Sequence, residues 1–232
     1  MLSVWPDPTE IPAEAKRQIM APVSADRGLC GGVNSAIIRL IRKQLAISVA
    51  DKKDVGLIMF GDKARGALER VYSPLFVASF TETGKAKPVT FREGMLLADI
   101  LLSYPYDSVT FTYNRFKNSI SYTTLSETAL SYALSVKDDD HWKNMNVEGD
   151  KLETLQNFYE FRMACRMYGY FVENATSEQS SRMSAMESST KNAGEMLSKL
   201  TLLFNRNRQA KITTELIEII AGAIASEEQV AK

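Results

Sequence analysis

The stretch SADRGLCGGVNSAIIR, residues 24–39, has the composition of a loop that could hold a phosphate. Glycines follow a β-type run and precede a helical pattern, and the first turn of a helix attracts anions. A Walker A loop, however, needs GxxxxGK[ST], and here Gly32 is followed by Val33 and Asn34. The GxGxxG spacing of dinucleotide sites is also missing. We therefore predict a tight strand-to-helix turn in which glycine serves backbone conformation and close packing, with nucleotide binding as the less favoured alternative.

The stretch GDKARG, residues 61–66, poses the same question. We interpret Gly61 as the end of a strand and Asp62 as the cap of the next helix. Thr90 is predicted to cap a later helix in the same way.

The inventory of reactive side chains is small. His141 is the only histidine, and it follows three aspartates in a polar stretch, which predicts a solvated loop. The two cysteines, Cys30 and Cys165, belong to no CxxC pair and are predicted to be small buried hydrophobes. We therefore assign no catalytic, cofactor-binding or metal-binding residue.

Charge and hydropathy narrow the classes of partner. The 28 basic and 28 acidic side chains cancel, so no overall field draws the chain to nucleic acid. No apolar run reaches the roughly 18–20 residues of a membrane-spanning helix, and we predict no direct membrane insertion.

Alternating β-type and helical runs between residues 18 and 135 predict an α/β domain with a Rossmann-like sheet flanked by helices. Strands are expected at 18–24, 54–60, 75–82 and 107–113, with a further one at 119–127. Helices are expected at 29–48, 62–71 and 91–103.

The remaining domain boundaries follow from proline and charge. Residues 1–17 form a proline-rich irregular segment, and residues 136–149 form a charged linker without periodicity. Asp150 and Glu153 resemble the start of a helix, which we expect to continue without proline to residue 226, leaving a tail at 227–232.

The second half of this predicted helix carries an apolar seam. Alternating steps of three and four residues visit mostly apolar positions: Met186, Ser189, Ala193, Met196, Leu200, Leu203, Asn207, Ala210, Thr214, Ile217, Ala221 and Ile224. A repeat of 3.5 residues held over five heptads predicts half of a coiled coil. A helix packed on its own domain is the alternative, but the chain offers no mate of comparable length.

The stretch FNRNRQAKIT places Arg206, Arg208 and Lys211 within this seam. A run of charge on a helix most often marks a solvated face. The alternative is a docking point for acidic residues of a partner, because the positive cluster interrupts the seam at one level.

Three stretches carry a resemblance to a known family. These are SADRGLCGGVNSAI at 24–37, NRFKNSISY at 114–122 and EQSSRMSAMESSTKNAGEMLSKLTLLFNRNRQAKITTELIEIIAGAIA at 178–225. Together they resemble the γ subunit of rotary F-type ATP synthases. The resemblance implies the central rotor shaft of F1Fo ATP synthase, a non-catalytic subunit without cofactors that couples proton-driven rotation of the membrane ring to conformational cycling of the catalytic β subunits.

The same resemblance implies the partners. They are the α3β3 hexamer of F1, the small δ/ε-type rotor subunits and the c-ring of Fo, at the matrix side of the mitochondrial inner membrane or, alternatively, the cytoplasmic side of a bacterial plasma membrane. In the family, an Arg-Gln pair engages a loop of the β subunit, and Arg208 and Gln209 match that pair. Arg206, Lys211, Ile217 and Ile220 are secondary candidates for partner contact.

One feature departs from the family. Its members begin with a long helix that winds against the C-terminal one, whereas only 23 residues precede Ser24 here, and WPDPTEIP contains three prolines. We expect this N-terminal γ helix to be a separate polypeptide or to be missing from the sequence given.

Two other functions remain open at this point. The α/β domain could be a ligand-binding or enzymatic module with a coiled-coil tail, although no acid, base and nucleophile set is recognisable. The chain could also be a static coiled-coil scaffold.

Overall fold

The structure, a computed structural model, describes residues 11–12, 14–51, 53–83, 89–137 and 148–230. The strands in this part of the chain are β1 (Arg17–Pro22), β2 (Asp54–Phe60), β3 (Phe76–Phe80), β4 (Ser108–Phe116) and β5 (Tyr122–Leu130). The helices are α1 (Val33–Ala50), α2 (Asp62–Tyr72), the short 3-10 helix η2 (Ser73–Leu75), α3 (Phe91–Leu102), α4 (Tyr132–Ser135) and α6 (Lys151–Val230). Linker residues 138–147, with His141, lie outside the described residues.

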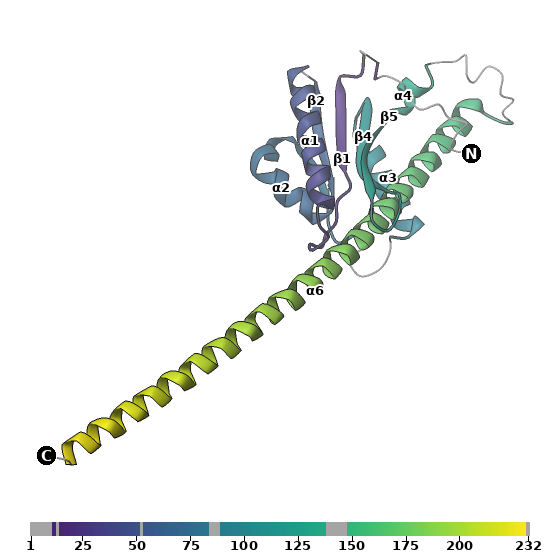
Figure 1. Cartoon of the computed structure of the whole chain (residues 1–232). Helices are drawn as coiled ribbons and strands as arrows, with labels where there is room; N and C mark the ends of the chain where they lie inside the picture. The colour runs from purple at the N-terminus through teal and green to yellow at the C-terminus, as the bar shows by residue number, and fades with distance from the viewer. Residues whose placement is uncertain (1–10, 13, 52, 84–88, 138–147, 231–232) are drawn as a thin grey trace. The chain divides into compact units, whose positions relative to one another are not determined.

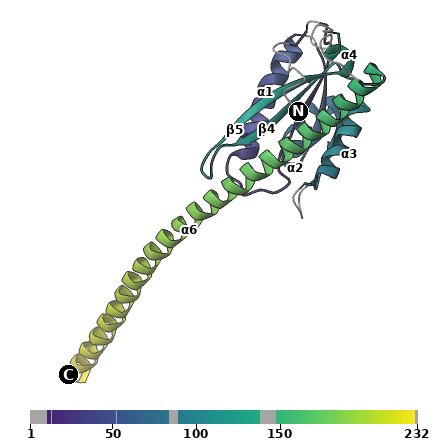
Figure 2. The same cartoon turned by 90° about the vertical axis from the view of Figure 1, so that its right-hand side faces the viewer.

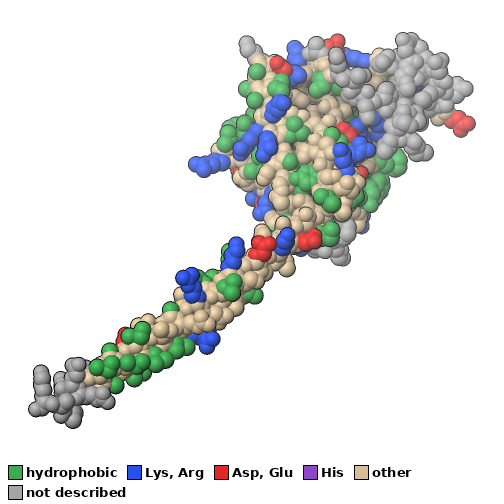
Figure 3. Space-filling view, viewed as in Figure 1, with side chains coloured by type: hydrophobic (Ala, Val, Ile, Leu, Met, Phe, Trp, Pro, Cys, Tyr) green, Lys and Arg blue, Asp and Glu red, His purple; other side chains and the backbone are tan. Residues whose placement is uncertain are grey.

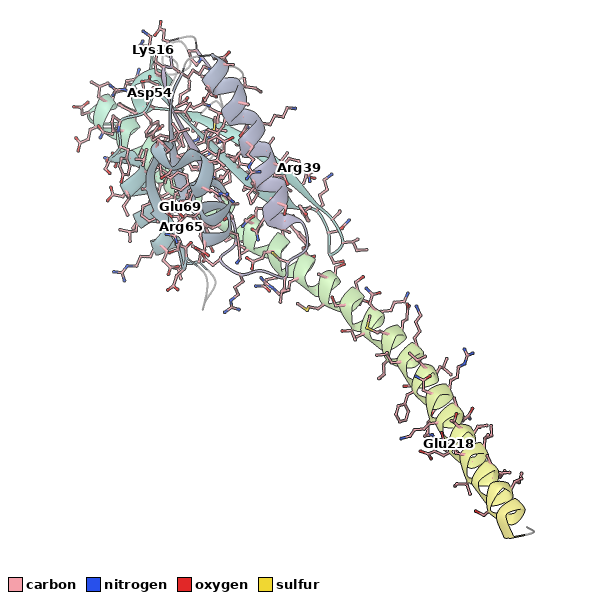
Figure 4. All side chains as sticks on the ribbon, turned by 90° about the vertical axis from the view of Figure 1, so that its left-hand side faces the viewer. Lys16, Arg39, Asp54, Arg65, Glu69 and Glu218 are labelled. Carbon is pink, nitrogen blue, oxygen red and sulfur yellow. The ribbon has the colours of Figure 1, made fainter. Side chains whose placement is uncertain are left out.

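The five strands form one sheet in the order β3-β2-β1-β4-β5. The pairs among β1 to β4 are parallel, and β5 runs antiparallel to β4. Lys16 and Asp54 lie at the amino ends of β1 and β2 (Figure 4). The Asp54 N–H donates to the Lys16 carbonyl at 3.0 Å. The chain proceeds from β1 to β2 and β3 on one side, then places β4 on the other side of β1. The strand order therefore reverses between β1 and β4, where doubly wound folds hold their ligands at the carboxyl ends of the strands.

Helices cover both faces of this sheet (Figures 1 and 2). Met20, Leu57 and Met59 face α1 and α2 in one core. Their neighbours along the strands, such as Ile19 and Ile58, face α3 and α6 in the other core. This alternation is the period of two expected of strands buried on both sides. The predicted α/β fold is confirmed, including the long C-terminal helix.

The α1 helix begins at Val33 rather than at residue 29 as predicted. Leu29 and Gly31 both have a φ of 60°. That left-handed conformation cannot continue a right-handed helix, so the helix starts after the glycines. The apolar face of α1 is buried through Ile37, Ile41 and Leu45, while Arg39 lies on its exposed face (Figure 4).

Among the other boundaries that differ from the prediction, two have a clear local cause. β5 begins at Tyr122 rather than at 119, because the Asn118 side chain accepts from the backbone N–H groups of Ile120 and Ser121 and closes a turn there. The α6 helix continues through Val230, into the predicted tail, since neither proline nor glycine follows Gly222 to stop it.

Two predicted helix starts are found in the structure. Thr90 and Glu93 form a capping box at the start of α3. At the start of α6, Asp150 Oδ1 accepts from the Leu152 N–H at 2.9 Å.

The chain divides into two compact units, Met1–Ala185 and Met186–Lys232. The first contains the sheet, its covering helices and the part of α6 up to Ala185. The second is the remainder of α6. The boundary predicted at residue 150 therefore falls within the first unit.

Candidate functional site

The first turns of α6 pack apolar side chains against the sheet, and later turns bring polar ones. Leu155, Tyr159, Met163, Met167 and Phe171 belong to the core that α6 shares with the sheet. Further along α6, the same face carries small polar residues. They give α6 hydrogen-bonding groups near β4, where the strand order reverses.

Asn114, near the carboxyl end of β4, is the centre of a buried network. Its side-chain amide donates to Asn174 Oδ1 on α6 at 3.0 Å and to the Val33 carbonyl at 3.3 Å. Its Oδ1 accepts from Thr124 on β5 at 2.7 Å, and its carbonyl accepts from Ser177 Oγ at 3.1 Å. Asn114 and Ser177 are fully buried. The network is satisfied internally and ties β4 to β5, to α6 and to the start of α1.

The turn at residues 28–32, which we call the first glycine turn, is hydrogen-bonded to segments in the same region. The Ala25 N–H donates to Asn34 Oδ1 at 2.9 Å, and the Asn34 amide donates to Cys30 Sγ at 3.2 Å. Ser181 Oγ on α6 donates to the Cys30 carbonyl at 2.8 Å. A Cβ added at Gly31 would lie 2.9 Å from Ser181 Oγ. The prediction that glycine serves conformation and close packing here is confirmed, and the element that packs closely is α6.

The two cysteines fit an inert role. Burial raises the pKa of the Cys30 thiol, and the Glu178 carboxylate raises it further, so the thiol stays protonated near neutral pH. Cys165 is only partly buried, which corrects the prediction of full burial. It lies on α6 beside the core-facing residues Ala164 and Arg166, and a helix buries only one face.

At the second glycine turn, where Gly61 precedes α2, the hydrogen-bonding groups are also satisfied by other residues of the chain. Gly61 has a φ of 96° and stands at the cap of α2, so the prediction that Asp62 caps this helix is wrong. The first three N–H groups of α2 donate to residues 24–26 instead: Asp62 N–H to Asp26 Oδ1, Lys63 N–H to the Ala25 carbonyl, and Ala64 N–H to Ser24 Oγ. An anion at this helix end would have to displace these bonds.

A third polar cluster joins β5 to α6 around Glu127. Tyr113 and Tyr170 donate their hydroxyls to its carboxylate at 2.6 and 2.8 Å, and Arg166 approaches it at 3.4 Å. Burial by itself would raise the pKa of the Glu127 carboxyl, but these donors outweigh it and hold the pKa below its ordinary value. Glu127 is therefore an ionised group that fixes α6 to the sheet.

Two hollows mark the surface of the first unit. A groove of about 1050 Å³ lies between α3 and α6, lined by apolar side chains such as Met95 and Phe161 and by acidic ones such as Glu93 and Glu160. A hollow of about 700 Å³ lies beside residues 24–27 and α6. Neither lining contains a histidine or a cysteine. Within the described residues, no group of three or more metal-binding side chains comes together.

The residues predicted for partner contact all lie on the second unit. They are Arg206, Arg208, Gln209, Lys211, Ile217 and Ile220, and every one is exposed. Lys211 forms an ion pair with Glu215 at 3.7 Å, one helical turn away. Arg208 and Lys211 are three residues apart and therefore share a face of the helix. Their roles stay predictions.

Large apolar side chains are exposed along the same part of the helix (Figure 3). Leu200 and Leu203 of the predicted seam are 55% and 53% exposed, and Ile217 is 61% exposed. An apolar surface of this extent on one helix marks an interaction surface.

The sequence is similar to proteins of one known family. The family model described as ATP synthase matches residues 6–225. The γ subunit of the rat mitochondrial ATP synthase F1 complex is 40% identical over 217 residues, which are 92% of this chain and 78% of that protein. The chain belongs to the ATP synthase γ-subunit family. Its relatives form the central stalk of F1Fo.

Other members are similar over comparable lengths. The mitochondrial γ subunit of Arabidopsis thaliana is 39% identical over 92% of this chain and 68% of its own. The γ chain of the bacterium Paracoccus denitrificans is 34% identical over 91% of this chain and 74% of its own. The family thus includes mitochondrial and bacterial proteins at similar distances from this one.

Solved structures give the same assignment. A chain from the central stalk and c-ring of the Tetrahymena thermophila mitochondrial ATP synthase matches with a TM-score of 0.68 at 29% identity, covering 78% of this chain and 80% of that one. A chain of the Euglena gracilis enzyme matches with a TM-score of 0.78 at 20% identity, covering 91% and 73%, and supports the fold. None of the described helices is both long and apolar enough to cross a lipid bilayer.

The residues that sequence reasoning missed are Asn114, Asn174, Ser177 and Ser181. A signal for three of them was present, because positions 174, 177 and 181 continue the spacing of Met163, Met167 and Tyr170 along one face of α6. The side chains at these positions change from apolar to small polar, so hydropathy alone did not indicate that the buried face of α6 continues there.

Proposed function

We propose that this chain is the central rotor shaft of an F1Fo ATP synthase, coupling proton-driven rotation of the membrane ring to conformational cycling of the catalytic β subunits. The observation that carries the proposal is the exposed apolar face of the second unit, on a chain of γ-subunit family membership. A helix with Leu200, Leu203 and Ile217 in water needs a partner chain, which a shaft inside a subunit ring would have.

The mechanism needs no reactive group in this chain. An asymmetric rod inside a ring of three alternating subunit pairs contacts each pair differently and so biases the open and closed states of each catalytic site. Turning the rod moves those biases around the ring. The coupling is therefore a difference in contact free energy between rod orientations.

Arg208 and Gln209 are the residues we propose for contact with the β subunit. Both side chains are exposed, and guanidinium binds carboxylates through paired hydrogen bonds. Arg206 and Lys211 add positive charge at the same level of the helix, and Ile217 and Ile220 add apolar contact further along it.

We place the chain at the matrix side of the mitochondrial inner membrane, with the α3β3 hexamer, the δ/ε-type rotor subunits and the c-ring of Fo as partners. The high identity to mitochondrial relatives supports this location. A second γ helix is expected to pair with α6, and a separate polypeptide or further sequence of this protein would supply it.

The structure disfavours the alternative of an enzymatic or ligand-binding module. Asn114, near the carboxyl end of β4, hydrogen-bonds to Asn174 of the same chain, and the hollow beside residues 24–27 and α6 is lined by no histidine or cysteine. The N–H groups at the start of α2 are likewise bonded to residues 24–26.

The test is the assembled complex carrying Arg208→Ala and Gln209→Ala together. We expect the rate of ATP synthesis to fall by about tenfold, the effect of losing about 1.4 kcal/mol at the limiting step. Lys191→Ala with Asn192→Ala is the matched control, because it removes an adjacent cation and amide from the same helix. A static scaffold would show unchanged rates in both variants, and failure of the native chain to assemble with F1 subunits would refute the proposal.

A further inference from the structure

The part of α6 nearest the end of the first unit carries a cluster of polar contacts that we call the polar collar. Its members lie within three helical turns: Glu173, Asn174, Ser177, Ser180, Ser181 and Arg182. The apolar contacts of α6 with the core come earlier along the helix, from Leu155 to Phe171. Polar contacts thus continue the docking of α6 beyond its apolar core, towards the end of the compact unit at Ala185.

The collar is bonded to two separate segments of the chain. On the β4–β5 hairpin, Glu173 accepts from the Phe116 N–H at 2.8 Å, and Ser180 donates to the Ser119 carbonyl at 2.6 Å. At the first glycine turn, Ser181 donates to the Cys30 carbonyl at 2.8 Å.

Arg182 adds to the contact with the glycine turn. It donates to the Gly28 carbonyl at 3.5 Å, and its guanidinium is held by Glu178 and by Gln179 Oε1. The side chains of Arg182 and Glu178 are 19% and 13% exposed, so water screens this ion pair only partly. The arginine is thus held in place beside the turn.

These bonds add a directional resistance to rotation of α6 to the resistance that its apolar packing already gives. The burial of apolar area is non-directional, so only the shape of the packed side chains opposes a turn of the helix about its own axis there. Hydrogen bonds weaken steeply when their angles change. Because the acceptors lie on two different segments, a turn of α6 in either direction strains bonds to at least one of them.

We infer that the polar collar holds α6 against rotation about its own axis relative to the sheet domain, so that Ser180, Ser181 and Arg182 are positioning residues for torque transmission. This inference rests on the proposed function, since only a rotating shaft carries torque along α6. It assigns the first glycine turn a mechanical role, which is to accept bonds from α6.

The experiment uses the assembled complex with a triple variant, Ser180→Ala, Ser181→Ala and Arg182→Ala. With the catalytic ring fixed and the rotor stalled, the angular fluctuations of a probe on the sheet domain report the torsional stiffness of the shaft. We expect the variance of the angle to rise by at least about twofold, since three directional bonds are lost while the apolar core remains.

Two companion variants make the result specific. The matched control is Ser184→Ala, Lys191→Ala and Ser198→Ala, which removes the same kinds of group from exposed positions on α6 outside the collar and should leave the variance unchanged. Ser180→Thr, Ser181→Thr and Arg182→Lys keep the donors and should restore much of the stiffness. A general loss of folding would instead lower the unfolding temperature, and the Thr, Thr and Lys substitutions would then not restore the stiffness.

Equal variance in the native chain and the triple variant would overturn the inference. If the triple variant does not assemble, Ser181→Ala alone is measured, and a variance equal to native then overturns it as well. The proposed function fails differently, because in that case the native chain itself would not rotate within the complex.

Discussion

At Gly31 two independent requirements meet in one residue. Its φ of 60° lies in the left-handed region, and its missing Cβ leaves room for Ser181 Oγ. Other side chains would face backbone strain and a close contact together. Glycine at this one position is thus required both by the turn and by the helix that docks on it.

Gly149 allows these two costs to be separated, because its φ of 84° is also positive but no atom lies within 4 Å of its added Cβ. We expect Gly149→Ala to lower the free energy of unfolding by about 1 kcal/mol, the strain alone. Gly31→Ala should cost about 2–3 kcal/mol, because the contact with Ser181 adds to the strain. Urea unfolding of the chain measures both, and equal losses would show that the contact with α6 carries no energy.

At the scale of elements, α6 docks on the sheet through a core and an ionised group together. Tyr113 on β4 and Tyr170 on α6 donate to the same carboxylate of Glu127 on β5. Removing the Glu127 carboxylate leaves the buried hydroxyls of Tyr113 and Tyr170 without this acceptor. The charge state of Glu127 therefore contributes to the docking of α6 beside the apolar core.

This dependence predicts an effect of pH on stability. The Glu127 pKa in the folded chain lies below its ordinary value of 4.5, so the folded state binds this proton less readily than the unfolded state. Its contribution is then fully present above pH 4.5 and is lost as the pH falls through the lower, folded-state pKa.

The urea midpoint of Glu127→Gln should lie below that of the native chain at neutral pH, and the gap should narrow on acidification below about pH 4.5. Glu69→Gln, at an exposed position of α2, is the control and should leave no gap of this kind. A gap that is the same at pH 3 and pH 7 would contradict the assignment of the charge.

At the scale of the whole molecule, the two units obtain their stability in different ways. The first unit buries two cores around a five-stranded sheet. In the second, every side chain described is exposed, so the helix there has its backbone hydrogen bonds and local side-chain contacts such as Lys211–Glu215, but no buried core. An isolated helix draws little stability from these alone.

Hydrogen exchange should therefore divide the chain at about Ala185. In the chain by itself, we expect the amides of residues 186–230 to exchange much faster than those of β1 and β4. Within the assembled complex, exchange in the apolar stretch should slow, because partner subunits cover it. Strong protection of that stretch in the chain alone would show that it needs no partner.

Local patterns in the sequence were enough to predict much of this protein. The alternation of strands and helices, the Thr90 cap, the proline-free helix and its apolar seam all depend on residues close together in the chain. The family motifs around the first glycine turn and along α6 pointed to the γ subunit for the same reason.

Tertiary structure alone decided how the first glycine turn is used and how α6 is hydrogen-bonded to β4. Ser181 and Cys30, which hydrogen-bond through a hydroxyl and a carbonyl, are 151 residues apart, and Asn114 and Asn174 are 60 apart. A hydrogen bond between small polar groups leaves no periodic mark in the sequence, whereas buried apolar faces do. Such partners become known only when the fold has brought distant segments within about 3 Å of each other.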